Sequence, residues 1–326
     1  MNLSLTLGCG WYDRTEPLAR GWVRPQGIDL HVQTIDDPRE LFDRLVARGD
    51  LDIAEFSSSE YIAMVSRGCA PFVALPIFMS RSFRHSFICI NTSKGIKNPK
   101  DLEGRRIGVP LYTMSAAIWC RGVLRNEHSV DLSGITWIEG AMDKPGSHGA
   151  PKVHDLAKPT MIEPNETGRS LSDLLESGEI DATLGALMPQ GFGISSKIAR
   201  LFPNIRETEI ASYRKTGNHP IMHLLVMRRE LHEQQPWVAR VLATAFDEAK
   251  RVALERLYYT GAPRSMLPLL HAEVEETRAI FGDDPWPDGI SRNRSTIDTL
   301  IAHMIDDGII TRRPEYGELF VDVGLD

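Results

Sequence analysis

Apolar runs and segments with helical spacing alternate along the first part of the chain. Short apolar runs predict strands at Leu3–Leu7, Leu30–Ile35 and Leu51–Ala54. Between and after them, apolar residues that recur every three to four positions predict helices over Pro38–Arg48 and Glu60–Arg67. This alternation of strands and helices predicts an α/β fold.

A second series of the same kind follows. Its pattern predicts strands at Phe87–Ile90, Arg106–Val109, Ile135–Trp137 and Ala182–Ala186, with helices at Ser115–Leu124 and Leu171–Glu176. Residues 143–164 have no periodicity and predict a long loop. An isolated strand at Leu224–Met227 precedes helices at Pro236–Tyr258, Leu269–Phe281 and Ser295–Asp307. We expect two lobes, one made of residues 1–88 and 226–326 and the other of residues 89–225.

Composition narrows the classes of partner. The chain has 326 residues, and this length exceeds what a single core normally organises. Hydrophobic residues make up 42% of it and charged residues 25%. A net charge of −7 argues against nucleic acid. We expect no membrane attachment and a cytoplasmic location, because there is no run of about 18 apolar residues and no secretory signal pattern at the N-terminus. The four cysteines show no CxxC spacing, which argues against disulfides or a thiolate metal site. The sequence leaves a homo-oligomer open.

The segment Phe78–Asn91 carries the first candidate chemistry. It places Arg81, Arg84 and His85 among serines and between apolar stretches. Guanidinium groups match carboxylates bidentately, and histidine moves protons near neutral pH. The segment therefore indicates carboxylate capture together with acid–base chemistry. The alternative interpretation is a surface turn that leads into the strand at Phe87–Ile90.

The order of elements resembles a known fold superfamily. Two α/β series joined by two crossing strands resemble the type 2 periplasmic-binding-protein fold, in which a ligand cleft lies between the lobes. Three local strings are similar to that superfamily: Gly49–Ala54, Asn98–Val109 and Gly178–Thr183. Within this superfamily, the chain resembles the 4,5-dihydroxyphthalate decarboxylase family over nearly its whole length. Four strings carry this resemblance: Pro76–Ser86, Gly108–Trp119, Pro220–His223 and Asp284–Ile290.

The N-terminus of the helix at Ser115 is a second candidate. Tyr112, Thr113 and Ser115 lie between a strand and this helix, so hydroxyl groups and free N–H groups would face the cleft that the resemblance implies. The helix dipole favours an anion at such a position. The alternative is simple N-capping by Thr113.

A similar cluster ends the strand at Leu51–Ala54. Glu55 is followed by Ser57 and Ser58, and either serine could cap the next helix. A carboxylate beside an anion site either pairs with Arg81 or Arg84, or has a raised pKa and donates a proton. Pairing is the commoner outcome.

Three further residues belong to the predicted cleft. Arg14 follows a glycine-containing turn after the first strand, and it could bind a carboxylate or form a solvated salt bridge. His219 and His223 are four residues apart, on one face of an extended segment. That spacing invites a metal, but there is no HExxH helix and no recognisable third ligand, so we favour hydrogen-bonded cleft histidines and predict no metal.

The family resemblance implies the loss of one carboxylate from a 4,5-dihydroxyphthalate-like substrate, giving a dihydroxybenzoate and CO2. The substituted ring can act as the electron sink, so no cofactor is expected. We assign Arg81, Arg84, Thr113 and Ser115 to the carboxylates, His85 to proton transfer, and Glu55 or His223 to the phenolic oxygen. The alternatives are a solute-binding protein for an organic carboxylate that feeds an ABC importer, and a cytosolic ligand sensor.

Overall fold

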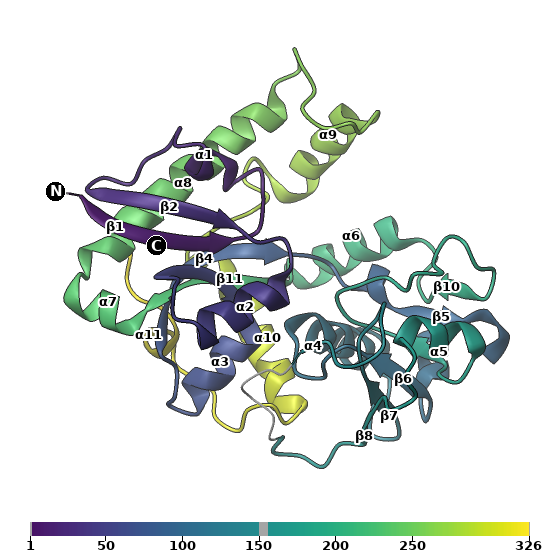
Figure 1. Ribbon diagram of the computed structural model, residues 1–326. Coiled ribbons are helices and arrows are strands. Elements are labelled where there is room, and N and C mark those ends of the chain that lie inside the picture. The colour runs from purple at the N-terminus through teal and green to yellow at the C-terminus, as the bar shows by residue number, and fades with distance from the viewer. Residues whose placement is uncertain (1, 150–155, 326) are drawn as a thin grey trace.

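Two separate β-sheets organise the chain in the computed structural model, which describes residues 2–149 and 156–325 (Figure 1). The first sheet has the order β2 (Ile28–Thr34), β1 (Leu3–Cys9), β3 (Ile53–Ser57), β11 (Ile221–Arg228) and β4 (Phe72–Arg81). The second has the order β10 (Ile198–Arg200), β5 (Cys89–Asn91), β9 (Ala182–Thr183), β6 (Arg106–Val109), β7 (Thr136–Glu139) and β8 (Ile162–Pro164). Together with the solved structure described below, this arrangement confirms the predicted two-lobed α/β fold.

The first long helix shows how local sequence sets an element. In α2 (Pro38–Ala47), Asp37 is the N-cap and its carboxylate accepts a hydrogen bond of 2.8 Å from the backbone N–H of Arg39. Proline at the first helical position needs no N–H partner there. Leu41 and Leu45 are buried on one face of the helix. The predicted start of this helix is confirmed.

Helices cover both faces of the first sheet. One apolar core joins the sheet to α2, α3 (Ser58–Ser66) and α10 (Arg294–Asp306). A second core packs the opposite face against α8 (Trp237–Tyr258) and α1 (Glu16–Ala19). Burial on both faces explains why β4 and β11 are almost continuously apolar.

The second sheet has its own helices. These are α4 (Ser115–Gly122), which continues into a π-helical turn (Val123–Glu127), α5 (Leu171–Ser177) and α6 (Ile205–Thr216). The remaining helices are α7 (Arg229–Gln234), α9 (Leu270–Phe281) and α11 (Tyr316–Leu319). In the predicted loop at residues 143–164, the last three residues form β8, and residues 150–155 lie outside the described residues.

The chain crosses between the sheets twice. It leaves after Arg81, the last residue of β4, and a 3-10 turn (His85–Phe87) then precedes β5, so the predicted strand at Phe87–Ile90 begins two residues later. It returns just before Ile221. The predicted boundary between residues 225 and 226 falls inside β11, all of which pairs within the first sheet.

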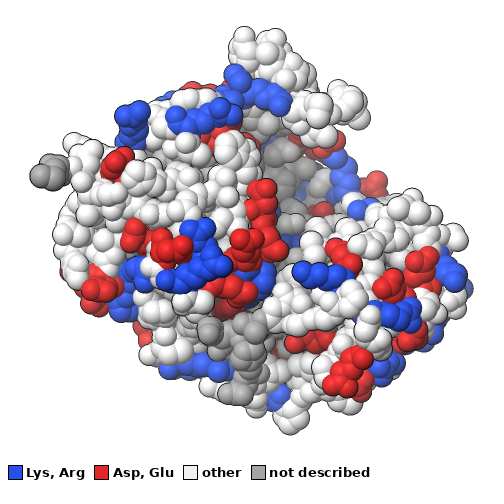
Figure 2. Space-filling model, in the orientation of Figure 1, with Lys and Arg blue, Asp and Glu red and all other residues white. Residues whose placement is uncertain are grey.

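Charges of both signs are interspersed over the face of the molecule in Figure 2, with no continuous basic surface. Within the described ranges, no helix is long and apolar enough to cross a membrane.

Candidate active site

A histidine–carboxylate pair with a buried carboxylate lies near the strand ends of the first sheet, where β1 and β3 end and β11 begins. The Glu55 side chain on β3 is 1% exposed. Its Oε1 lies 2.6 Å from Nδ1 of His223 and accepts a hydrogen bond of 2.7 Å from the Tyr12 hydroxyl. Its Oε2 accepts a bond of 3.0 Å from the backbone N–H of Gly10. Three donors therefore converge on one carboxylate.

These contacts set the charge of Glu55. Burial alone would raise the pKa of its carboxyl, but the hydrogen bond and charge of His223, with the Gly10 and Tyr12 donors, hold that pKa below its ordinary value. Among the described residues Glu55 pairs with His223 and not, as predicted, with Arg81 or Arg84, and the alternative prediction of a raised pKa is wrong as well. Burial and the neighbouring carboxylate raise the pKa of Tyr12, which stays a neutral donor. An ionised Glu55 fixes the proton of His223 on Nδ1 and leaves Nε2, which no described residue hydrogen-bonds, for other chemistry.

A cluster of serines joins the two lobes next to this pair. Ser57 Oγ caps α3 by accepting a bond of 3.4 Å from a backbone N–H, and it lies 3.3 Å from Oγ of Ser115 at the start of α4. Ser59 Oγ lies 3.0 Å from Ser115 Oγ and donates a bond of 2.8 Å to the carbonyl oxygen of Thr113. The N-termini of α3 and α4, and with them the positive ends of two helix dipoles, therefore meet between the lobes.

The start of α4 carries no side-chain cap. Its N-cap is Met114, which makes no capping hydrogen bond, so the alternative in which Thr113 caps this helix is wrong. The first N–H groups of an uncapped helix remain available to an anion. Ser58 is buried at the start of α3, and its Oγ has no partner among the described residues.

The pair and the serine cluster adjoin each other between the lobes. In the antiparallel pairing of β11 with β3, His223 lies directly opposite Ser57, which in turn contacts Ser115 of the other lobe. We call Tyr12, Glu55, Ser57, Ser115 and His223 the interlobe site.

Two predicted cleft residues lie apart from this pair, against aromatic rings. The Arg14 guanidinium stands 4.1 Å from the ring centre of Tyr12 and 4.2 Å from that of Trp286, in a cation–π arrangement. It also forms an ion pair of 3.3 Å with the exposed carboxylate of Asp13, which is the salt bridge that the sequence offered as an alternative to a bound carboxylate. The His219 ring stacks on Phe83 at 5.1 Å. Burial, and then the nearby charge of Arg81, lower the pKa of His219 to about 3, so this imidazole is neutral.

Tyr112 belongs to the core of the second lobe. The Arg121 guanidinium lies 3.7 Å from its ring centre, and the ring packs edge-on against Trp137. Its side chain is therefore directed away from the interlobe site, and the neighbouring Thr113 contributes through its backbone.

Arg81 is held by the protein itself. Its Nη1 donates a bond of 3.0 Å to the carbonyl oxygen of His219, and its Nη2 donates one of 2.7 Å to that of Pro287 and another to Asn293. Burial lowers the pKa of this guanidinium to about 10. These contacts fit a structural role in tying the outgoing crossing segment to the C-terminal part of the chain.

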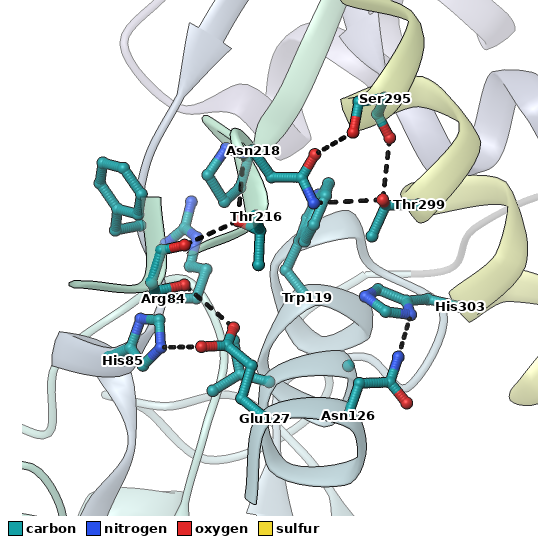
Figure 3. A pocket seen from close by; sticks show the side chains of 15 residues that line it. Arg84, His85, Trp119, Asn126, Glu127, Thr216, Asn218, Ser295, Thr299 and His303 are labelled. Carbon is teal, nitrogen blue, oxygen red and sulfur yellow. Dashed lines mark hydrogen bonds and ion pairs between the residues drawn. The ribbon is translucent and has the colours of Figure 1, made fainter. Parts of the chain in front are cut away.

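Arg84 and His85 line a different cavity, a pocket of about 310 Å³ that Arg81, Thr113 and the interlobe site do not line (Figure 3). Nε2 of His85 lies 3.5 Å from Oε2 of Glu127, not beside Glu55. Both His85 and His223 were therefore predicted as site residues, but the sequence does not show that their partners are Glu127 and Glu55. Glu127 and Tyr12 were missed altogether, because neither lies in a motif that carries chemistry.

Known proteins resemble this chain in sequence and in fold. It is 35% identical to 4,5-dihydroxyphthalate decarboxylase of Comamonas testosteroni, over 99% of this chain and 98% of that protein. Against the enzyme of that name from Pseudomonas putida it is 37% identical over 58% of this chain and 73% of that protein. A family model described as an ABC transporter, phosphonate, periplasmic substrate-binding protein matches residues 12–143. The periplasmic aliphatic sulphonate binding protein SsuA of Escherichia coli has a similar fold, with a TM-score of 0.53, 11% identity, and coverage of 99% of this chain and 93% of that one. The chain belongs to the 4,5-dihydroxyphthalate decarboxylase family.

Proposed function

We propose that this protein catalyses the non-oxidative decarboxylation of a hydroxylated aromatic dicarboxylate of the 4,5-dihydroxyphthalate type, giving a dihydroxybenzoate and CO2. The observation that carries the proposal is the 35% identity to a relative of that name over almost the whole chain. The interlobe site supports it, because it combines a histidine–carboxylate pair with hydrogen-bond donors for an acid.

The substrate itself supplies the path for electrons. In 4,5-dihydroxyphthalate each carboxylate is para to a hydroxyl group, so electron donation from that oxygen makes the carboxylate-bearing carbon basic. Protonation of this carbon, with loss of the proton from the para hydroxyl group, gives a cyclohexadienone. The C–C bond to the carboxylate then breaks and CO2 leaves. The electron pair of that bond restores the aromatic ring, and the ketone oxygen becomes a phenolate that takes up a proton again. The protein has to hold the diacid and deliver one proton.

Two groups of the interlobe site suit these tasks. Nε2 of His223 delivers the proton to the substrate. Ionised Glu55 fixes the orientation of the imidazole ring and stabilises the imidazolium, as a buried carboxylate does for a catalytic histidine. The uncapped N-terminus of α4, with Ser115, binds the carboxylate that stays on the ring. His223 therefore takes the role that the sequence suggested for His85.

The two histidine–carboxylate pairs offer a matched test. His223→Gln and His85→Gln change the same atoms in different surroundings. We expect the kcat for CO2 release to fall about 10²–10⁴-fold in His223→Gln, and substrate should still raise the melting temperature of this variant. The loss in His85→Gln should be smaller by at least about tenfold. An equal or larger loss in His85→Gln would assign proton transfer to His85.

A solute-binding protein for the same class of acid is the second candidate, and the match of residues 12–143 to a substrate-binding protein family favours it. Such a protein would be stabilised by 4,5-dihydroxyphthalate without releasing CO2. An enzyme of aromatic degradation works in the cytoplasm, where we propose this chain is found. Cell fractionation with an antibody against the chain tests that location.

A further inference from the structure

A partly open cavity lies where the chain crosses between the sheets. It has a volume of about 310 Å³ and lies between the two crossing segments, α4 with its π-helical turn, α6 and α10 (Figure 3). We call it the hinge pocket and define it by the lining residues that its chemistry uses: Arg84, His85, Trp119, Asn126, Glu127 and Asn218. The proposed reaction uses none of them.

One side of the hinge pocket carries an unpaired positive charge. Arg84 is 7% exposed, and within the described parts of the chain no carboxylate lies at ion-pair distance from it. Its Nε contacts Sδ of Met222 at 3.1 Å, and its guanidinium lies 4.6 Å from the ring centre of Phe87. Burial lowers the pKa of this guanidinium to about 10, which leaves it charged at neutral pH. The Glu209 carboxylate acts on Arg84 only beyond ion-pair distance. A buried cation that forms no ion pair is unfavourable unless an anion joins it.

The opposite side offers hydrogen-bond partners. Burial opposes the charge on Glu127, but His85 and the Ser212 hydroxyl hold the pKa of this carboxyl below its ordinary value, so it is an acceptor. The amides of Asn126 and Asn218 also line the cavity. Figure 3 shows His85 and Glu127 facing each other below Arg84, with the side chain of Trp119 extending toward Asn218.

The backbone around the cavity is specialised. The helix α4 widens into a π-helical turn at Val123–Glu127, a deviation that is frequent at functional sites. Gly122 precedes this turn, and a Cβ atom at its position would lie 2.2 Å from Nε2 of His303. The absence of a side chain allows His303 to pack edge-on against Trp119 at 5.4 Å.

We propose that the hinge pocket is a second ligand site, which takes a small aromatic monocarboxylate with a hydroxyl group. The carboxylate binds Arg84, the ring packs beside Trp119, and the hydroxyl group donates to Glu127. Both crossing segments line the cavity, so binding of this ligand affects how the two lobes are positioned relative to each other.

Calorimetry with 4-hydroxybenzoate tests this site without any turnover, so its outcome is independent of the proposed reaction. Arg84→Met should weaken binding roughly tenfold to a hundredfold, the loss expected for a charge-assisted hydrogen bond. Ser115→Leu, which alters the interlobe site, should bind the acid within about twofold of the unaltered protein. Phenol, which lacks the carboxylate, should bind at least about tenfold more weakly than the acid.

Ser295→Trp is a second cavity variant, for use if Arg84→Met fails to fold. It places a bulky ring at an exposed position that lines the same cavity, and it should abolish binding of the acid. Unchanged affinity in both cavity variants would overturn the proposal. So would weakened binding in Ser115→Leu alone, because the acid would then occupy only the interlobe site. Equal affinity for phenol would rule out recognition by Arg84.

Discussion

The substitution Glu55→Gln tests the centre of the interlobe site. It keeps the size of the side chain and removes its charge. The Glu55 carboxylate accepts three hydrogen bonds, from Gly10, Tyr12 and His223. A charge-assisted hydrogen bond contributes about 1.5–3 kcal/mol and a neutral one about 0.5–1.5 kcal/mol, and the single amide oxygen cannot serve all three donors. We expect the free energy of unfolding to fall by about 2–4 kcal/mol and kcat to fall about 10²–10⁴-fold.

The pH dependence of stability gives an independent check. The pKa of Glu55 is lower in the folded protein than its ordinary value of 4.5. Its contribution to stability is therefore fully present above that value and is lost as the pH falls through the folded-state pKa. Urea unfolding of both proteins between pH 7 and pH 3 should show the stability difference shrinking below about pH 4.5. A difference that stays constant down to pH 3, or wild-type turnover in Glu55→Gln, would refute this reasoning.

Three further substitutions test the packing around both sites. Gly122→Ala pushes a methyl group against His303, and thermal unfolding should show a loss of about 1–3 kcal/mol; an unchanged melting temperature would contradict the close contact. Asp307→Asn breaks a 2.7 Å ion pair with Arg121 in which both side chains are fully buried, and urea unfolding should show a loss of about 3–5 kcal/mol; a loss below about 1 kcal/mol would contradict it. Arg81→Gln removes donors from buried acceptors and should destabilise by about 2–4 kcal/mol in the same assay; undiminished stability would argue that this arginine is a ligand-binding group.

Elements with strong local signals were predictable from the sequence. The Asp37–Pro38 start fixed α2 because capping depends on neighbouring residues. The strand β4 was missed because it is buried on both faces and so lacks alternation. The helix α6 was missed for the opposite reason: only Ser212 is buried in it, and its sequence has no apolar stripe.

The site was predictable residue by residue but not in its pairing. Glu55 and His223 were each recognised, yet 168 positions separate them, and nothing local shows that β11 returns beside β3. Arg81, Arg84 and His85 were grouped because they are close in sequence. The strand β4 ends at Arg81 and a 3-10 turn begins at His85, so Arg81 packs against the C-terminal part of the chain while Arg84 and His85 line the hinge pocket. Contacts between strands distant in the sequence are set by the tertiary fold.

The most direct test is a single-turnover incubation of the protein with 4,5-dihydroxyphthalate, measuring CO2 and the aromatic product together. The account predicts one CO2 for each dihydroxybenzoate formed, without consumption of oxygen, and almost no product from His223→Gln in the same time. A protein that is thermally stabilised by 4,5-dihydroxyphthalate but releases no CO2 would contradict it and would identify a binding protein instead.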